Sequence, residues 1–457
     1  MESINDEDEF LSLKLAIATQ QPLGCERNKK RKRREDLVSI SSYEEEIYSL
    51  LQIGEQMLNS THKTSKESSG GREGLHLINL LLVAAAAVND NNLTSAMANL
   101  SELCQNVSVL GDAIQRVSAY FAAALTARLL TQKSPFYHTI MKPPTSQEEF
   151  LAFTHLYKVS PLYQFAHFTA NQAIIEAFEN ENKPSLHVID FDISHGFQWP
   201  SLIQSLSQNI TTTPALLNRI SLRITGFATT LNELQETEAR LLSFAKGFRN
   251  LSFEFHGLLK GSNLGNIVTL ENETTAVNLS FHVNDNRLTA DISETLKAVH
   301  SLRPSVVTVV EQDVICRKLP QSFLSRFMES LHYFAAMFDS LDDCLPIDSH
   351  ERLSIENHLG REIKSVMNFD DQRHDERERV LLESGGFCEM ELSSKNVMQA
   401  KLLLKIRSHS PSSSSSSSSS CVNNGGFRVV ERDDGKGISL AWQDRCLITA
   451  SAWQCCV

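Results

Sequence analysis

The spacing of apolar residues changes near residue 186. Before that point apolar residues recur at helical spacing, as in DAIQRVSAYFAAALTARLL at 112–130. The stretch LHLINLLLVAAAAV at 75–88 is apolar on nearly every side, which is typical of a helix buried all round. Residues 74–180 are therefore predicted to form mainly packed helices, which we interpret as a cap.

After residue 186, short runs rich in β-branched and aromatic residues alternate with helical segments. Near-continuous apolar strands separated by helices predict a parallel sheet that is covered on both faces. The closing runs FRVVER, ISLAWQ and CLITASAW predict an antiparallel hairpin. The expected fold class is α/β: a methyltransferase-like, doubly wound, mostly parallel sheet with a C-terminal antiparallel hairpin and an N-terminal helical cap. The predicted parallel strands span 186–193, 221–228, 251–258, 276–283 and 305–313.

The first part of the chain differs in composition from the rest. It is polar and charged with weak periodicity, which predicts a disordered arm at 1–72. The remaining residues, 73–457, are expected to form one folded domain, with the cap mainly at 74–180 and an α/β core at 184–457. A run of serines predicts a loop at 408–426 that need not be ordered.

A basic run, RNKKRKRR, lies within the predicted arm at 27–34. One interpretation is a solvated run of charge. The other is a nuclear import signal, whose exposed cations bind acidic grooves on an import carrier. The acidic remainder of the chain and the flexible setting favour import, so we expect a nuclear location and an import carrier as partner. The residues of this signal are Arg27, Lys29, Lys30, Arg31, Lys32, Arg33 and Arg34.

Charge and cysteine content exclude several classes of protein. The formal net charge of −12 over 457 residues argues against a basic nucleic-acid footprint over the whole chain. Nine cysteines without CxxC spacing indicate reduced thiols, as in the cytosol or nucleus. The most apolar stretch, at 80–88, is too short to span a bilayer, and no N-terminal stretch has the form of a signal peptide. We expect no membrane partner.

The loop from Asp192 to Trp199 lies where doubly wound folds bind cofactors. A phosphate or S-adenosylmethionine loop needs several glycines for close backbone approach, but Gly196 is the only glycine in this loop. The second predicted strand, at 221–228, has no acid to hold a ribose near its end. Asp190 and Asp192 are candidate cofactor ligands, although acids at a strand end more often cap the next helix. We expect no cofactor.

Other catalytic signatures are equally weak. The sequence has no HExxH, GxSxG or P-loop motif. His187 and His282 lie on predicted strands, where a structural role is favoured over a base or metal ligand. Glu311 and Asp313 end the fifth predicted strand without an identifiable partner base. We therefore expect no enzyme, no catalytic residue and no metal. The open alternative is a methyltransferase-like enzyme or small-molecule receptor that uses the crevice at the strand ends.

Several motifs, in order, resemble those of the plant GRAS family of transcriptional regulators. LHVID at 186–190 resembles the VHIID signature of the family, and Gln198-Trp199-Pro200 follows it as expected. The segments at 75–130 and 231–247 are similar to the two leucine-rich regions. SLHYFAAMFDSLD and ERLSIENHLGREIKSVM resemble the PFYRE region, and ISLAWQDRCLITASAW resembles the SAW motif. The family-motif residues are His187, Asp190, Gln198, Trp199, Arg361, Glu362, Trp442 and Trp453.

The resemblance implies a scarecrow-like transcription factor or co-regulator in development or symbiosis. It implies partnership with other GRAS proteins, as homodimer or heterodimer, and with DNA-binding transcription factors including zinc-finger proteins. DNA would be reached directly or by recruitment. Direct contact needs a basic patch on the fold, and the surrounding acids favour recruitment. Candidates for such a patch are Lys246, Arg249, Lys260, Lys395, Lys401, Lys405 and Arg407.

Overall fold

The computed structural model describes residues 70–209, 220–262, 265, 267–280, 292–313, 322–368, 382–408 and 426–456. Nearly all of the predicted arm, with its basic run at 27–34, lies outside the described residues, as does the predicted serine-rich loop apart from its two end residues. Within the described part, none of the helices has both the length and the hydropathy needed to cross a membrane.

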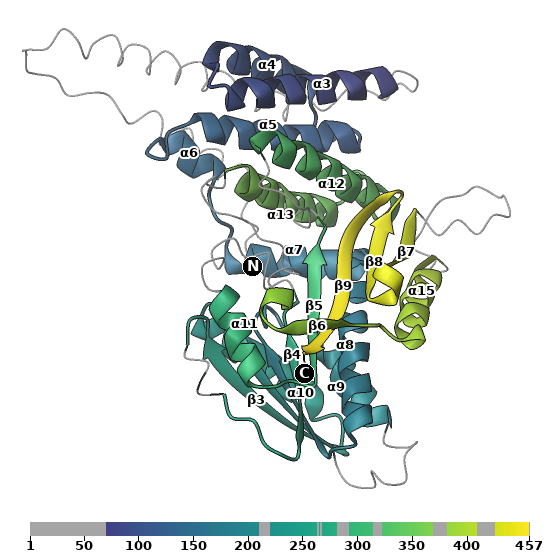
Figure 1. Cartoon of the computed structure of the whole chain (residues 1–457). Coiled ribbons are helices and arrows are strands. Elements are labelled where there is room, and N and C mark those ends of the chain that lie inside the picture. The colour runs from purple at the N-terminus through teal and green to yellow at the C-terminus, as the bar shows by residue number, and fades with distance from the viewer. Residues whose placement is uncertain are drawn as a thin grey trace, which may run out of the picture. The chain divides into compact units, whose positions relative to one another are not determined.

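A nine-stranded sheet organises the fold, with the strand order β3-β2-β1-β4-β5-β9-β8-β7 and β6 paired with β9 (Figure 1). The first five strands in sequence pair in parallel, and the last four pair antiparallel. The expected α/β class, with a mostly parallel sheet and antiparallel C-terminal strands, is confirmed. The parallel strands are β1 Ser185–Asp190, β2 Ile220–Ala228, β3 Leu251–Leu259, β4 Glu273–Asn278 and β5 Val306–Gln312. The antiparallel strands are β6 Phe387–Met390, β7 Phe427–Arg432, β8 Gly437–Trp442 and β9 Arg445–Cys455.

Two of the predicted parallel strands have bounds that differ from the structure by more than one residue. The first ends at Asp190 instead of 193, because the chain turns there and Ser194 adopts a positive φ of 44°. The fourth begins at Glu273 and ends at Asn278, and residues 281–283 of the prediction lie outside the described residues. Both strands therefore stop level with each other, since Asp190 pairs with Asn278.

Several helices begin where a polar side chain caps their free N–H groups. Asp112 accepts from the backbone of Gln115, and Thr145 and Thr230 each form a reciprocal capping box with a glutamate. The helices before the sheet are α3 Gly70–Asn89, α4 Leu93–Asn106, α5 Ala113–Leu129, α6 Pro135–Ile140, α7 Ser146–Val159 and α8 Leu162–Glu181. Those that follow are α9 Trp199–Asn209, α10 Leu231–Ala245, α11 Ile292–Ser301, α12 Phe323–Cys344, α13 His350–Met367 and α15 Ser394–Ser408.

The helical cap is built from two separate stretches of the chain. Helices α3, α4 and α5 pack together, and α12 and α13 pack onto α5 beside them (Figure 1). By contrast, α8 lies against β4, β5 and β9 and so covers the sheet. The division made from the sequence placed the cap mainly at 74–180 and left α12 and α13 in the core. The place of α12 and α13 in the cap depends on their contacts with α5, which include hydrogen bonds between residues more than 200 positions apart in the chain.

A buried ion cluster joins the two stretches of the cap. The guanidinium of Arg116, on α5, is fully buried and lies 2.8 Å from Glu356 of α13 and 2.5 Å from Asp342 of α12. Arg352 also reaches both carboxylates, at 3.1 Å and 3.5 Å. Two cations facing two anions compensate one another's loss of hydration, so the cluster fixes α5 on α12 and α13.

The expectation that all cysteines are reduced thiols is wrong for two of them. Cys388 and Cys456 form a disulfide, with their Cα atoms 5.3 Å apart. They are 68 positions apart in the sequence, and no spacing rule connects them. Antiparallel pairing of β6 with β9 sets Phe387 opposite Cys455, and this pairing brings the two thiols together.

Candidate functional site

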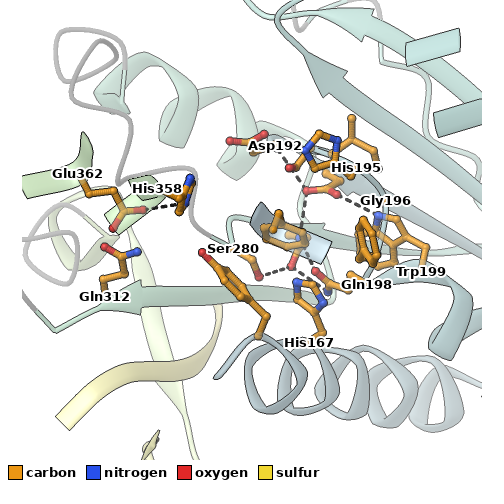
Figure 2. A pocket seen from close by; sticks show the side chains of 17 residues that line it. His167, Asp192, His195, Gly196, Gln198, Trp199, Ser280, Gln312, His358 and Glu362 are labelled. Atoms are coloured by element: carbon orange, nitrogen blue, oxygen red, sulfur yellow. Dashed lines mark hydrogen bonds and ion pairs between the residues drawn. The ribbon is translucent and has the colours of Figure 1, made fainter. Parts of the chain in front are cut away.

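A cavity of about 220 Å³ opens where the parallel strands β1, β4 and β5 end. Helices α7, α8 and α13 contribute residues to its lining, and the sheet side contributes the loop that follows β1. Figure 2 shows Glu362 and His358 on one side of the cavity and Asp192, His195 and Trp199 on the other. This is the edge at which doubly wound sheets place their ligands.

Asp190 is the last residue of β1 and is almost fully buried at the floor of the cavity. One carboxylate oxygen accepts from the indole N–H of Trp199 at 3.0 Å, and the other accepts from the Asn278 amide at 3.0 Å. The backbone N–H of Asp192 donates to the same carboxylate. Burial raises the pKa of Asp190 to about 7 despite these donors. The carboxyl group is therefore held in one orientation, and its pKa of about 7 makes it only partly ionised near pH 7.

A chain of buried amides continues from Asp190 into the wall. Gln198 donates to the side-chain oxygen of Asn171 at 3.0 Å and to that of Asn278 at 3.3 Å. Asn171 in turn donates to the backbone carbonyl of Gln198 at 3.0 Å. These reciprocal bonds satisfy the buried polar groups and fix the start of α9 against α8. Gln198 is consequently a positioning residue of the wall.

Two glycines lie where the loop between β1 and α9 packs too closely for a side chain. Gly196 has a φ of +70°, and a Cβ there would lie 2.8 Å from the Thr237 methyl group on α10. A Cβ on Gly226 would lie 2.9 Å from Ile193 of the same loop. The ring of Phe197 packs on Phe153 of α7, with centroids 5.2 Å apart. Bulky side chains fill the loop, so its backbone does not form the open glycine-rich cradle of a phosphate site.

On the cap side, α13 presents a pair of residues one turn apart. His358 Nε2 lies 3.3 Å from Glu362. Its Nδ1 lies 2.8 Å from a guanidinium nitrogen of Arg361, which can only donate, so this ring nitrogen is the acceptor. Arg361 also bonds Glu149 of α7 at 3.1 Å and is not among the described residues that line the cavity. The adjacent motif residues Arg361 and Glu362 thus have different positions: one joins α13 to α7, and the other lines the cavity.

The charge of the lining is acidic. Burial lowers the pKa of His167 to about 3, and burial and the nearby Arg240 lower the pKa of His195, so both imidazoles are neutral near pH 7. Asp192 pairs with Lys260 of β3's outgoing turn at 3.1 Å. Among the described residues that line the cavity, none is Lys or Arg.

The other motif residues lie outside the cavity. His187 is buried in the sheet, where Nε2 lies 2.8 Å from Thr225 and Nδ1 lies 3.2 Å from Arg223. Arg223 has no acceptor, so the His187 Nδ1 must accept and Nε2 must donate. Trp442 donates to Asp339 of α12 at 2.6 Å, and Trp453 is buried in a second, smaller core cluster that includes Val307 and Phe387. These three side chains support the scaffold.

The described residues also show where the remaining candidate ligand groups lie. They contain no cluster of three or more His, Cys, Asp or Glu side chains able to hold a metal ion. The first acid after β2 is Glu233, and its carboxylate accepts from the backbone N–H groups of Thr229 and Thr230 at the start of α10. The Glu233 carboxylate therefore caps the start of α10 instead of extending toward the place where a ribose would bind.

Part of the candidate basic patch is engaged within the fold. Lys260 pairs with Asp192, and Lys401 pairs with Glu431 at 3.2 Å. Arg407 reaches the carbonyls at the end of α7 and the side chain of Gln164. Three of the seven candidate cations therefore already have acidic or carbonyl partners in the described structure.

Sequence reasoning missed Asn278, His167 and His358, although it named Asp190, Gln198, Trp199 and Glu362. Asn278 was missed because the strand predicted at 276–283 has it near the beginning, whereas β4 ends at this residue, level with the end of β1. The signal for His358 was its i, i+4 spacing from Glu362. No local signal placed the α13 pair opposite the β1 loop.

The chain matches the model of the GRAS domain family over residues 77–454. It is 37% identical to Protein SCARECROW of Pisum sativum over 397 residues, a match covering 84% of this chain and 44% of that protein. It is 36% identical to Protein SCARECROW of Arabidopsis thaliana over 414 residues, covering 87% and 58%. The chain thus spans about half the length of these relatives. Scarecrow-like protein 23 of Arabidopsis thaliana is 35% identical over 401 residues, covering 84% and 91%.

A solved structure is also similar. The crystal structure of SCL7 from Oryza sativa matches with a TM-score of 0.65 and 29% sequence identity, covering 83% of this chain and 99% of that one.

Proposed function

Because this chain belongs to the GRAS domain family, we propose that it is a plant nuclear regulator of transcription of the scarecrow-like type. The observation that carries the proposal is the match of one family model to residues 77–454, which include nearly all the described elements. The relatives with SCARECROW names support the same class. A role in plant development is part of the proposal.

The regulator acts through contacts with other proteins. Helix α15 exposes Met398, Leu402 and Ile406, which are 69%, 54% and 62% accessible and spaced four residues apart. Exposed apolar side chains aligned on one helix face are typical of surfaces that other proteins cover. Other GRAS proteins and DNA-binding transcription factors, including zinc-finger proteins, are the proposed partners.

Recruitment to DNA by such partners fits the charge of the molecule better than direct binding. A protein that neutralises several phosphates needs a free cluster of Lys and Arg side chains. The net charge here is −12, and Lys260, Lys401 and Arg407 are engaged within the fold. The basic run at 27–34 is assigned to the import carrier.

A regulatory role rather than an enzymatic one is supported by the strand-end loop. The loop after β1 is filled by Phe197 and its aromatic neighbours, and the acid after β2 caps α10. The elements that would hold a nucleotide-like methyl donor are therefore used for packing and capping.

The test is to tether the full chain to a promoter in plant protoplasts through a heterologous DNA-binding domain. A regulator changes the reporter output severalfold in either direction relative to the binding domain alone. A matched control carries Arg116→Met, which breaks the cap cluster and is expected to abolish the effect. Equal reporter output with and without the tethered chain contradicts the proposal.

A separate test addresses import. Replacement of the seven basic residues at 27–34 by alanine is expected to leave a fluorescent fusion of the full chain outside the nucleus. Fusing an unrelated import signal to the same variant should restore nuclear entry. Undiminished nuclear accumulation of the alanine variant contradicts the assignment of this run.

A further inference from the structure

The cavity at the strand ends has carboxylates on two opposite sides. Asp192 comes from the loop that follows β1, and Glu362 comes from α13 of the cap (Figure 2). The carboxylates of Asp192 and Glu362 line the cavity, and the field of such groups favours positive charge. Phosphates, sulfates and carboxylates are disfavoured by the same field.

The cations nearby do not neutralise both sides. Lys260 compensates Asp192 at 3.1 Å. Across the cavity, Glu362 Oε1 lies 3.3 Å from the imidazole of His358, while its buried Oε2 atom has no hydrogen-bond partner among the described residues. Arg361, the next residue, directs its guanidinium to Glu149 and to Nδ1 of His358. The carboxylate of Glu362 therefore retains capacity for a charged donor.

Aromatic rings form another part of the wall. Phe153, Tyr163 and Phe197 line the cavity and come from α7, α8 and the β1 loop. Phe153 lies 4.6 Å from Tyr163 and 5.2 Å from Phe197, measured between ring centroids. Aromatic faces beside carboxylates attract organic cations, because the ring quadrupole and the negative charge act in the same direction.

We propose that this cavity binds a small organic cation, an amine with a compact apolar body, with its charged group at Glu362 and its apolar body against Phe153 and Phe197. The cavity volume of about 220 Å³ limits the ligand to a compact molecule. Since the walls come from both the cap and the sheet, such a ligand would contact α13 and the β1 loop together. The proposal stands on the cavity and is independent of the role in transcription.

The test compares three probes of similar size and different charge on the full chain by isothermal titration. Phenethylamine is the cation, 2-phenylethanol the neutral counterpart and 3-phenylpropanoate the anion. The amine is expected to bind about tenfold more tightly than the alcohol, since charge-assisted hydrogen bonds are the stronger ones, and the anion is expected to bind most weakly. Equal binding of amine and alcohol, stronger binding of the anion, or no heat from any probe at its solubility limit overturns the proposal.

Variants locate the site. Glu362→Gln should weaken amine binding about tenfold and leave alcohol binding unchanged, because it removes the charge and retains the shape. Glu254→Gln removes an exposed carboxylate on β3, outside the cavity, and is the control for net charge. Asp192→Asn is the second site variant, with circular dichroism to verify folding. Unchanged amine affinity in both site variants overturns the assignment to this cavity.

Discussion

Asp190 should make the stability of the protein depend on pH in a way that Asp190→Asn removes. Burial raises its pKa from 3.8 to about 7. At 1.36 kcal/mol per pKa unit, this difference corresponds to roughly 4 kcal/mol between the charged and neutral forms. The carboxylate at the floor of the cavity therefore opposes folding when it is ionised.

The sign follows from proton binding. Between about pH 4 and 7 the folded state holds a proton on Asp190 that the unfolded state has released, so this contribution is fully present at low pH and lost as pH rises through about 7. From about pH 5 to about pH 8 the loss is roughly 3 kcal/mol. Asparagine cannot titrate, and its altered hydrogen bonds add an offset that does not change with pH.

The assay is urea unfolding of the full chain and the variant at several pH values. The free energy of unfolding of the parent protein, minus that of Asp190→Asn, should fall by roughly 3 kcal/mol across this range. Taking the difference cancels the opposite trend from His167, whose pKa is lowered. Glu254→Gln reports the effect of net charge alone. A difference that stays constant with pH refutes the reasoning.

Three further predictions concern the scaffold. Arg116→Met should lower the free energy of unfolding by about 3 kcal/mol or more, because Glu356 loses a partner at 2.8 Å, and adding Glu356→Gln should recover part of the loss in a urea-unfolding cycle. Trp453→Ala should lower it by about 3–5 kcal/mol, measured the same way, since this side chain fills the second core; no loss would show that the site is not packed. Burial and Arg223 lower the pKa of His187 from 6.5 to about 3. Between these two pH values the unfolded state therefore binds a proton at this histidine that the folded state does not bind. His187→Asn should therefore reduce the loss of stability as pH falls below about 6.5, and an unchanged acid profile would contradict this.

The sheet was largely predictable because its strands are apolar runs with a local signature. The runs at 221–228 and 251–258 match β2 and β3 to within one residue at each end. The end of β1 was predicted three residues late, since the positive φ of Ser194 has no reliable marker in a serine. Local pattern thus identified the strands but not the turn that shapes the cavity.

The site was only half predictable. Asp190 and Trp199 belong to one short motif, and their hydrogen bond spans nine residues. The hydrogen bond from Asn278 to Asp190 spans 88 residues and depends on β1 pairing with β4. Glu362 reaches the cavity because the buried Arg116 cluster holds α13 against α5. Sequence periodicity carries no information about such contacts, since they depend on which helices pack together.

The central claim is that this regulator reaches genes through partner proteins. The most direct test titrates the full chain against a pool of random-sequence DNA duplexes at about 50 and 200 mM salt. The retained duplexes are then sequenced. The account predicts weak retention that vanishes at the higher salt and enriches no sequence. Enrichment of a defined sequence that persists at the higher salt, with reduced affinity, would contradict recruitment and show that the chain reads DNA itself.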